Sequence, residues 1–250
     1  MKNTIPIEAP DIKSEVDSIL SSLPTETEVE VTLPSKGKFY GDACPTGNVK
    51  IRPLSFNDEK ALLSIQNKNA DPGALILSRC VTGVDSMALV MMDKFFLIMK
   101  IREISYGDDY QVECRCSHCE ASNPLQFILS QLEVKYVPED ILNPQEIDLP
   151  SLGKKAKVRL PRVYDEQYMA KAEVMMDNLW RWVEEIDGNS KSTVISQVIP
   201  SLPAADIHTL IKCVTNNEYG IETKARFTCD SCGNVNDIVI PITENFFSVN

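Results

Sequence analysis

The chain has 250 residues, 43% of them hydrophobic, and its 25 basic and 36 acidic side chains give a formal net charge of −11. This length accommodates one large domain or two smaller ones with a hydrophobic core. The acidic balance argues against a nucleic-acid-binding protein, which needs a basic face to neutralise phosphates. The most apolar stretch, residues 87–99, is too short and too interrupted by charge to insert in a membrane.

Residues 1–32 have a composition of their own, rich in acidic and hydroxyl side chains and without an aromatic residue. The spacing of their apolar residues predicts a short amphipathic helix over residues 11–23. Such a helix is marginally stable alone in water and needs a surface to pack on. We therefore predict a flexible acidic arm that packs on the chain's own core, frays, or docks on a partner. The candidate docking residues on its apolar face are Ile12, Val16, Leu20 and Leu23.

Residues 33–133 read as a first α+β unit. The predicted elements, in chain order, are a turn at residues 33–40, a basic strand at 49–52, and helices at 57–66, 75–80 and 94–104. Acidic side chains at Asp58-Glu59 suit a helix N-terminus, and Asp93 is the expected cap of the third helix. The aromatic pair Phe39-Tyr40 is a second candidate for partner docking, because aromatic anchors often dominate binding energy.

A Cys-x-x-Cys knuckle, Cys116-Ser-His-Cys119, closes the first unit between two strand-like segments. A linker, residues 134–148, leads to a second unit over residues 149–250. Its predicted elements are a turn at residues 149–155, a strand at 156–159, a long amphipathic helix at 165–186, a helix at 204–215, and a second hairpin knuckle, Cys229-Asp-Ser-Cys232. The long helix rests on apolar residues such as Met176 and Trp182 that recur at helical spacing and are expected in the core.

The two knuckles together predict one structural zinc site with the ligands Cys116, Cys119, Cys229 and Cys232. Cys114 and His118 are alternative ligands of lower rank. Free buried thiols remain an alternative, whereas no βαβ pattern supports a redox pair. No apolar signal-peptide segment is seen at the start, and cysteine pairs in a reducing cytosol bind metal more often than they form disulfides.

The two units share an ordered series of landmarks, which predicts an internal duplication. Each opens with Leu-Pro-Ser, continues with a short strand ending in Arg, and has an Asp-Glu pair at the same distance beyond it. Asp58 then corresponds to Asp165, and Cys116 to Cys229. Two related halves around a pseudo-two-fold axis would each bring one knuckle to a shared zinc ribbon.

Catalytic constellations are not recognisable in the chain. It has two histidines, His118 and His208, and neither stands near a nucleophile motif. No Gly-rich phosphate loop occurs. The repeated Asp-Glu pairs stand at predicted helix starts, where acids are expected for structural reasons. We therefore expect a protein that is not an enzyme and has no small-molecule substrate.

Four stretches together resemble the baseplate proteins of T-even-type contractile-tail phages, which include baseplate hub subunits and hub assembly catalysts. They are Leu33-Pro-Ser-Lys-Gly-Lys-Phe-Tyr, Ile51-Arg-Pro-Leu-Ser-Phe-Asn-Asp-Glu-Lys, Ile101-Arg-Glu-Ile-Ser-Tyr-Gly before a knuckle, and the closing Phe246-Phe247. The resemblance covers roughly residues 30–250 and implies a role in building the baseplate hub in the infected cell. It implies no catalytic residues.

The function predicted from the sequence is that of a non-enzymatic, chaperone-like hub assembly factor in the host cytoplasm, with hub proteins as partners and a structural zinc. One alternative is a structural subunit that stays in the virion tail. Another is a zinc-ribbon nucleic-acid or transcription accessory protein, which the acidic charge disfavours.

Overall fold

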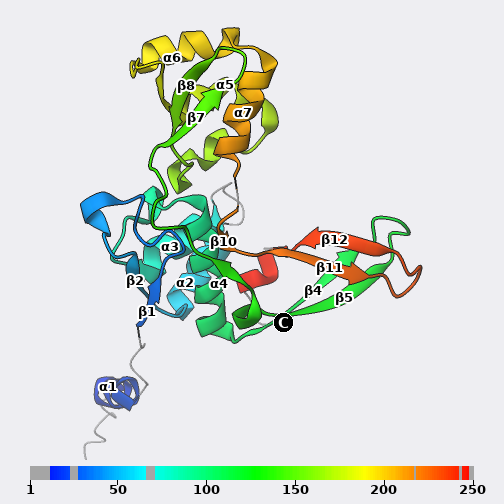
Figure 1. Ribbon diagram of the computed structural model, residues 1–250. Helices are drawn as coiled ribbons and strands as arrows, with labels where there is room; N and C mark the ends of the chain where they lie inside the picture. The colour runs from blue at the N-terminus through cyan, green and yellow to red at the C-terminus, as the bar shows by residue number, and fades with distance from the viewer. Residues whose placement is uncertain (1–11, 23–27, 66–70, 217, 242–243, 248–250) are drawn as a thin grey trace, which may run out of the picture.

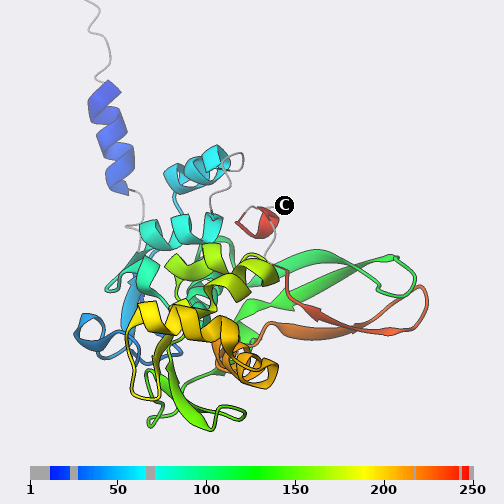
Figure 2. The same ribbon diagram turned by 90° about the horizontal axis from the view of Figure 1, so that it is seen from above.

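The computed structural model describes residues 12–22, 28–65, 71–216, 218–241 and 244–247. Figure 1 shows two lobes, one above the other, and a pair of hairpins that project to one side. We call these parts the first lobe, the second lobe and the hairpin arm. The helix α1 (Ile12–Ser22) stands clear of all three in Figures 1 and 2. None of the helices in the described ranges has the length and apolar character needed to cross a membrane.

The first lobe combines a three-stranded antiparallel sheet with helices. The strands, in sheet order, are β1 (Val29–Thr32), β2 (Asn48–Ile51) and β3 (Val81–Thr82), and the helices are α2 (Phe56–Ile65), α3 (Pro72–Cys80), α4 (Met91–Tyr106) and the short 3₁₀ turns η1 (Gly41–Ala43) and η2 (Ser86–Ala88). Asp71 caps α3, because its carboxylate accepts hydrogen bonds from the N–H groups of Gly73 and Ala74. The core is built around α4, which buries Leu97 and Ile101 completely.

The second lobe repeats this combination of a three-stranded antiparallel sheet and helices. Its strands are β7 (Gln145–Leu149), β8 (Lys154–Val158) and β9 (Val183–Ile186), and its helical segments are η4 (Val163–Tyr168), α5 (Ala172–Asn178), η5 (Leu179–Trp182), α6 (Ser192–Val198), η6 (Ile199–Ser201) and α7 (Ala204–Val214). It has a core of its own around the fully buried Trp182.

An arginine–aspartate pair follows the middle strand of the sheet in both lobes. Nη1 of Arg52 donates to Asp58 at 2.7 Å, and Nη1 of Arg159 donates to Asp165 at 2.7 Å. Both aspartates also accept a backbone hydrogen bond from the residue three positions earlier, at 2.9 Å in each case. These carboxylates therefore hold a turn and an arginine in place, which is a structural role.

A second matched contact joins the Leu-Pro-Ser turn of each lobe to a buried aspartate. The N–H of Ser35 donates to Asp93 on α4 at 3.0 Å, and the N–H of Ser151 donates to Asp206 on α7 at 2.7 Å. Both aspartates are fully buried. The lobes thus use the same residue types for the same contacts.

The hairpin arm consists of two antiparallel hairpins, β4 (Asp109–Arg115) with β5 (Ser122–Ile128) and β11 (Lys224–Thr228) with β12 (Val235–Val239). Both expected knuckle hairpins are therefore present. Strands β6 (Val134–Lys135) and β10 (Gly220–Ile221) pair near their base, with the 3₁₀ turns η3 (Leu129–Gln131) and η7 (Glu244–Phe247) completing the chain. Phe246 packs on Tyr110 at 4.9 Å between ring centroids, so the end of the chain returns to the first core.

The predicted amphipathic helix over residues 165–186 is wrong. The stretch contains η4, α5, η5 and β9, and its last part is extended because Val183 and Ile186 pair with β8. Leu179, Trp182 and Ile186 are buried, and their positions in the sequence match a helical spacing. They lie in a 3₁₀ turn and a strand, however, and not in one helix. The expected core role of this stripe is correct for those three residues and for Val183, and it is wrong for Met176, which is 46% exposed.

The predicted start of the third helix of the first lobe, at residue 94 with Asp93 as its cap, also needs correction. Helix α4 begins at Met91, and its N-cap is Val90. Asp93 lies inside the first turn, where its carboxylate accepts hydrogen bonds from the Ser35 N–H and the Tyr40 hydroxyl. Burial raises the pKa of Asp93 to about 6.

Candidate metal centre

The two knuckles lie next to each other at the far end of the hairpin arm, as Figures 1 and 2 show from two directions. Each knuckle is closed by the same pair of backbone bonds. Cys116 N–H donates to Ala121 at 2.9 Å and Cys229 N–H donates to Asn234 at 2.9 Å, while a return bond reaches each cysteine carbonyl. Glu120 and Gly233 take left-handed φ values of 60° and 72° at the matching positions of the two turns.

The four cysteine sulfurs form one cluster. The Sγ atoms of Cys116, Cys119, Cys229 and Cys232 all lie within 4.8 Å of one another. Two of the distances, Cys116 to Cys232 and Cys119 to Cys229, are 3.7 Å. A tetrahedral ion with metal–sulfur bonds of about 2.3 Å would separate its ligands by about 3.8 Å. The four predicted ligands are therefore brought together in a geometry that fits a tetrahedral metal ion.

Two buried asparagines connect the knuckles crosswise. The side-chain oxygen of Asn236 accepts from the N–H of Ser117 at 2.9 Å, and that of Asn123 accepts from the N–H of Asp230 at 3.0 Å. Each asparagine also donates to a carbonyl within its own knuckle. The contacts are reciprocal: each hairpin holds the knuckle of the other hairpin.

Backbone amides favour the thiolate at one sulfur of each knuckle. The N–H groups of Cys119 and His118 lower the pKa of Cys116 to about 6. Burial opposes ionisation of Cys229, but the N–H groups of Cys232 and Ser231 outweigh it and lower its pKa. Thiolates are the form that binds metal, so two of the four sulfurs are favoured in that form.

The lower-ranked ligands stay outside the cluster. Cys114 points into the small apolar core beneath the knuckles, and burial raises the pKa of its thiol. His118 contributes its backbone N–H to the Cys116 sulfur at 3.4 Å, and its ring is not among the side chains grouped around the sulfurs.

Asn123 and Asn236 are the site residues that we did not predict from the sequence. A signal for them existed: each asparagine stands at the same distance after the first cysteine of its knuckle. Asparagine in a β-strand is uncommon, and two at matching positions indicate a shared task. That signal is visible once the two knuckles are aligned.

We expect Asn236→Ala to weaken metal binding by about tenfold, because residues that orient metal ligands typically carry effects of this size. Asn123→Ala should have a similar effect because its contacts mirror those of Asn236. Competition with a colourimetric chelator measures both. The control is Gln126→Ala, which removes an exposed amide on the hairpin that carries Asn123. Equal affinities for all three variants would contradict the crosswise role.

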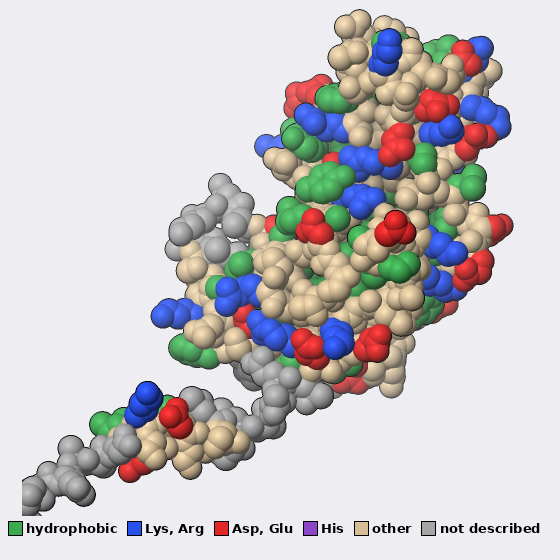
Figure 3. Space-filling model, turned by 90° about the vertical axis from the view of Figure 1, so that its left-hand side faces the viewer, with side chains coloured by type: hydrophobic (Ala, Val, Ile, Leu, Met, Phe, Trp, Pro, Cys, Tyr) green, Lys and Arg blue, Asp and Glu red, His purple; other side chains and the backbone are tan. Residues whose placement is uncertain are grey.

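The residues predicted for partner docking differ in exposure. On α1, Ile12 and Val16 are exposed, at 68% and 45%, and Figure 3 shows apolar side chains uncovered on this helix. The side chain of Leu20, and Leu23 altogether, lie outside the described residues. Phe39 and Tyr40 are buried in the first core, where the Tyr40 hydroxyl donates to Asp93. The prediction that this aromatic pair is an exposed docking site is therefore wrong.

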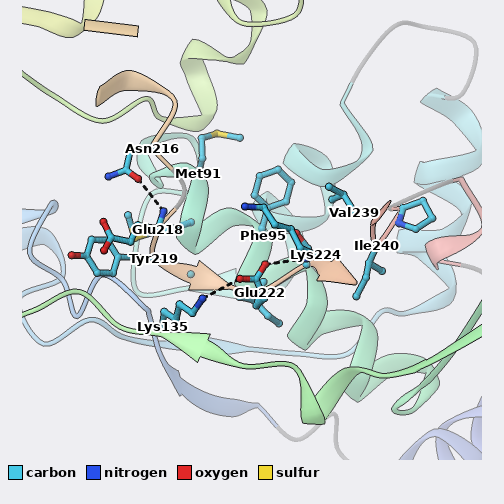
Figure 4. Close-up of a pocket in the computed structure, with 15 residues that line it drawn as sticks. Met91, Phe95, Lys135, Asn216, Glu218, Tyr219, Glu222, Lys224, Val239 and Ile240 are labelled. Atoms are coloured by element: carbon cyan, nitrogen blue, oxygen red, sulfur yellow. Dashed lines mark hydrogen bonds and ion pairs between the residues drawn. The ribbon is translucent and has the colours of Figure 1, made fainter. Parts of the chain in front are cut away.

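An apolar pocket of about 460 Å³ opens beside α4 at the base of the hairpin arm (Figure 4). Phe95, Tyr219 and Val239 line it, and Figure 4 shows them arriving from three different segments. At its edge Lys135 pairs with Glu222 at 3.0 Å. This lining suits an apolar side chain better than a charged substrate.

The chain was compared with known proteins. A family model described as T4 bacteriophage base plate protein matches residues 25–248. No curated protein and no solved structure gives a significant match.

Proposed function

Because the chain belongs to the family of T4 bacteriophage base plate proteins, we propose that it is a non-enzymatic factor that helps to assemble the baseplate hub. The family match over residues 25–248 is the observation that carries this proposal. The match supports a role in the phage baseplate or tail, with other baseplate proteins as partners. The acidic net charge of −11 suits protein partners better than nucleic-acid phosphates, so it gives no support to a transcription role.

Zinc is the metal that this sulfur cluster suits best. Thiolate ligands select soft or borderline metals, and a closed set of four cysteines is the usual structural zinc site. Bound zinc would supply a tetrahedral centre that holds two thiolates from each hairpin. The residues joined in this way are 110 and 116 positions apart in the chain. We infer that the ion acts as a clip, since all four positions are filled by protein.

We also infer that the chain is an internal duplication. The matched Arg–Asp pairs, the matched Ser–Asp contacts and the crosswise asparagines support this, because each contact recurs with the same residue types. The pairs Cys116–Cys232 and Cys229–Cys119 exchange with each other under a two-fold rotation. The zinc clip would then lie on the pseudo-two-fold axis.

The proposed partner surface is the apolar face of α1, where Ile12, Val16 and Ile19 are exposed. We expect Ile12→Asp/Val16→Asp to weaken binding of baseplate hub proteins severalfold while the fold and metal content stay unchanged, because an exposed apolar stripe gains most from burial in a partner. Pull-down of hub proteins from infected cells measures this. The charge-neutral control is Ser14→Ala on the same helix. Normal hub binding by the double variant would assign docking to another surface.

A truncation that tests the same surface must end before Val29. Residues 29–32 form β1, which pairs with β2 from Val29↔Ile51 to Thr32↔Asn48. Deletion of residues 1–27 therefore removes α1 and leaves the first sheet intact. Deletion through residue 32 would damage the first lobe, and its effect on hub binding would have no clear origin.

A structural subunit retained in the finished tail is the second candidate, because membership of the family fits it equally well. An assembly factor would act in the host cytoplasm and leave the assembled hub, whereas a subunit would stay. Mass spectrometry of purified tails separates the two. The assembly role predicts that this chain is absent from complete tails, and its presence there in a fixed ratio to other baseplate proteins would favour the subunit.

A further inference from the structure

The two lobes contact each other through a segment that follows β8. The N–H of Val163 donates to the Leu89 carbonyl at 2.9 Å. The guanidinium of Arg162 donates to the carbonyls of Ala88 and Phe39, both at 2.8 Å. The segment of the second lobe that follows β8 thus lies across the segment that leads into α4.

The surface of the first lobe at this contact is buried, and Leu89 and Val90 share a hydrophobic core with Leu160 and Val163 of the second lobe. Leu89 and Val90 are 0% and 1% exposed, and Lys94 is 4% exposed. The Lys94 ammonium lies 2.6 Å from Glu166 of η4 and 2.6 Å from Asp71. The turn of the second lobe that contains Arg162 and Val163 therefore covers an apolar surface at the start of α4.

The equivalent surface of the second lobe is uncovered. Asp206 on α7 makes the contact that Asp93 makes on α4, so the residues from Leu202 to Ile207 take the place of those from Leu89 to Lys94. Pro203 and Ala204 are exposed, and Leu202 and Ile207 are only half-buried. Leu202, Ala204 and Ile207 border a groove of about 610 Å³, whose other apolar lining residues include Met176, Leu179, Trp180, Ile199 and Ile211.

The equivalent of the covering turn is uncovered as well. Asp58 makes the contacts that Asp165 makes, so Phe56 of the first lobe takes the place of Val163. Val163 is 3% exposed, whereas Phe56 is 77% exposed. Leu63, which lies on the same face of α2 two turns later, is 65% exposed.

We propose that α2 of one copy of this protein docks in the second-lobe groove of another copy, with Phe56 and Leu63 as anchors. The contact would repeat between molecules the contact that joins the lobes within one molecule. Lys60 lies between the two anchors on α2, and Asp177 lines the groove, so the charges are complementary. An amphipathic helix in an apolar groove is a common recognition mode.

The two surfaces belong to different lobes, with α2 in the lower lobe and α5 to α7 in the upper lobe of Figure 1. Phe56 and Leu63 are exposed within one molecule, so the proposed contact forms between copies. Because it joins two different surfaces, it gives a two-fold dimer where two copies dock reciprocally, and otherwise a ring or an open chain. This inference does not depend on the role in baseplate assembly.

Sedimentation equilibrium of the full chain tests the proposal. The expected mass exceeds the 27.9 kDa of one chain and rises with concentration. Phe56→Asp and Met176→Glu should each lower the association constant by about thirtyfold, as expected for loss of an anchor. The control is Leu142→Asp, at a side chain that is 61% exposed elsewhere, and it should leave association unchanged. Circular dichroism verifies that each variant is folded.

Mixing the two variants gives the sharper result. The Phe56→Asp copy keeps an intact groove and the Met176→Glu copy keeps an intact α2, so the mixture should form a dimer and nothing larger. If either variant fails to fold, Lys60→Glu mixed with Asp177→Lys replaces it, and this pair should associate better than either protein alone. A protein that stays monomeric at every concentration would overturn the proposal, as would association that none of these substitutions changes.

Discussion

Cys229→Ser is expected to reduce bound zinc from about one ion per chain to almost none, because a structural site needs all four ligands. The two hairpins then lose the ion that joins them, and three thiols remain that repel each other once ionised. Loss of a structural metal belongs to the small class of changes that cost more than about 4 kcal/mol. Metal analysis by mass spectrometry and chemical denaturation measure the two effects.

The lobes should survive this substitution, since each has a hydrophobic core of its own. We therefore expect unfolding in two steps, with the hairpin arm first. Cys114→Ser is the matched control, because this thiol lies in the other hairpin of the arm and outside the sulfur cluster. Full zinc content in Cys229→Ser, or equal loss in Cys114→Ser, would contradict the assignment of the ligands.

Asp58→Ala is expected to destabilise the first lobe by a few kcal/mol, because it removes a buried carboxylate that accepts charge-assisted hydrogen bonds. The carboxylate is fully buried and receives hydrogen bonds from Arg52, Arg79 and both the N–H and hydroxyl of Ser55. Its removal takes this carboxylate away from the guanidinium groups of Arg52 and Arg79. Denaturation with urea measures the change.

The pH dependence of stability gives an independent measure of the same site. Burial raises the pKa of Asp58, but the hydrogen bonds from Arg52, Arg79 and Ser55 outweigh it and hold the pKa well below its ordinary value. The folded pKa is lower than the unfolded value of about 3.9, so this carboxylate stabilises the fold above that pH. The stabilisation is lost as the pH falls toward the folded pKa. The Asp58→Ala variant should lack that part of the acid dependence.

Asp237→Ala is the control for Asp58→Ala. Asp237 also pairs with an arginine, Arg226, at 2.7 Å, but the two side chains are 76% and 71% exposed. Exposed ion pairs contribute little to stability because water screens them. Similar destabilisation in the two variants would mean that burial of the Asp58 carboxylate does not determine its contribution.

The cluster of four cysteines was predictable because its chemistry is local. A Cys-x-x-Cys spacing allows two sulfurs to reach one ion, and alternating strands on both sides predicted the hairpins that carry Cys116 and Cys229. The prediction that the two distant knuckles meet came from the number of ligands, because a structural zinc ion needs four and each knuckle supplies two. The crosswise asparagines were missed, because a hydrogen bond between segments this far apart leaves no periodic pattern.

The long helix over residues 165–186 was not predictable in this way, because burial and periodicity are different properties. Trp182 and Ile186 are buried, and their spacing matches both a helix and the sequence of turn and strand that the chain forms. Pairing of β9 with β8 decided between them, and a single segment does not contain that information.

The aromatic pair Phe39-Tyr40 was misplaced for a related reason. Aromatic side chains serve equally as core residues and as docking anchors, and composition does not distinguish the two. The buried Asp93 gives the Tyr40 hydroxyl a partner in the core, and this contact spans the first lobe. Phe56, which is 77% exposed, carried no sequence signal that separated it from Phe39.

Infection with a phage that lacks this protein tests the assembly role most directly. Baseplate intermediates are separated by sedimentation after infection. We predict that the other baseplate proteins are made but that no complete baseplate forms, and that supply of the full chain from a plasmid restores complete baseplates. Complete baseplates and infectious tails in the absence of the protein would contradict the account.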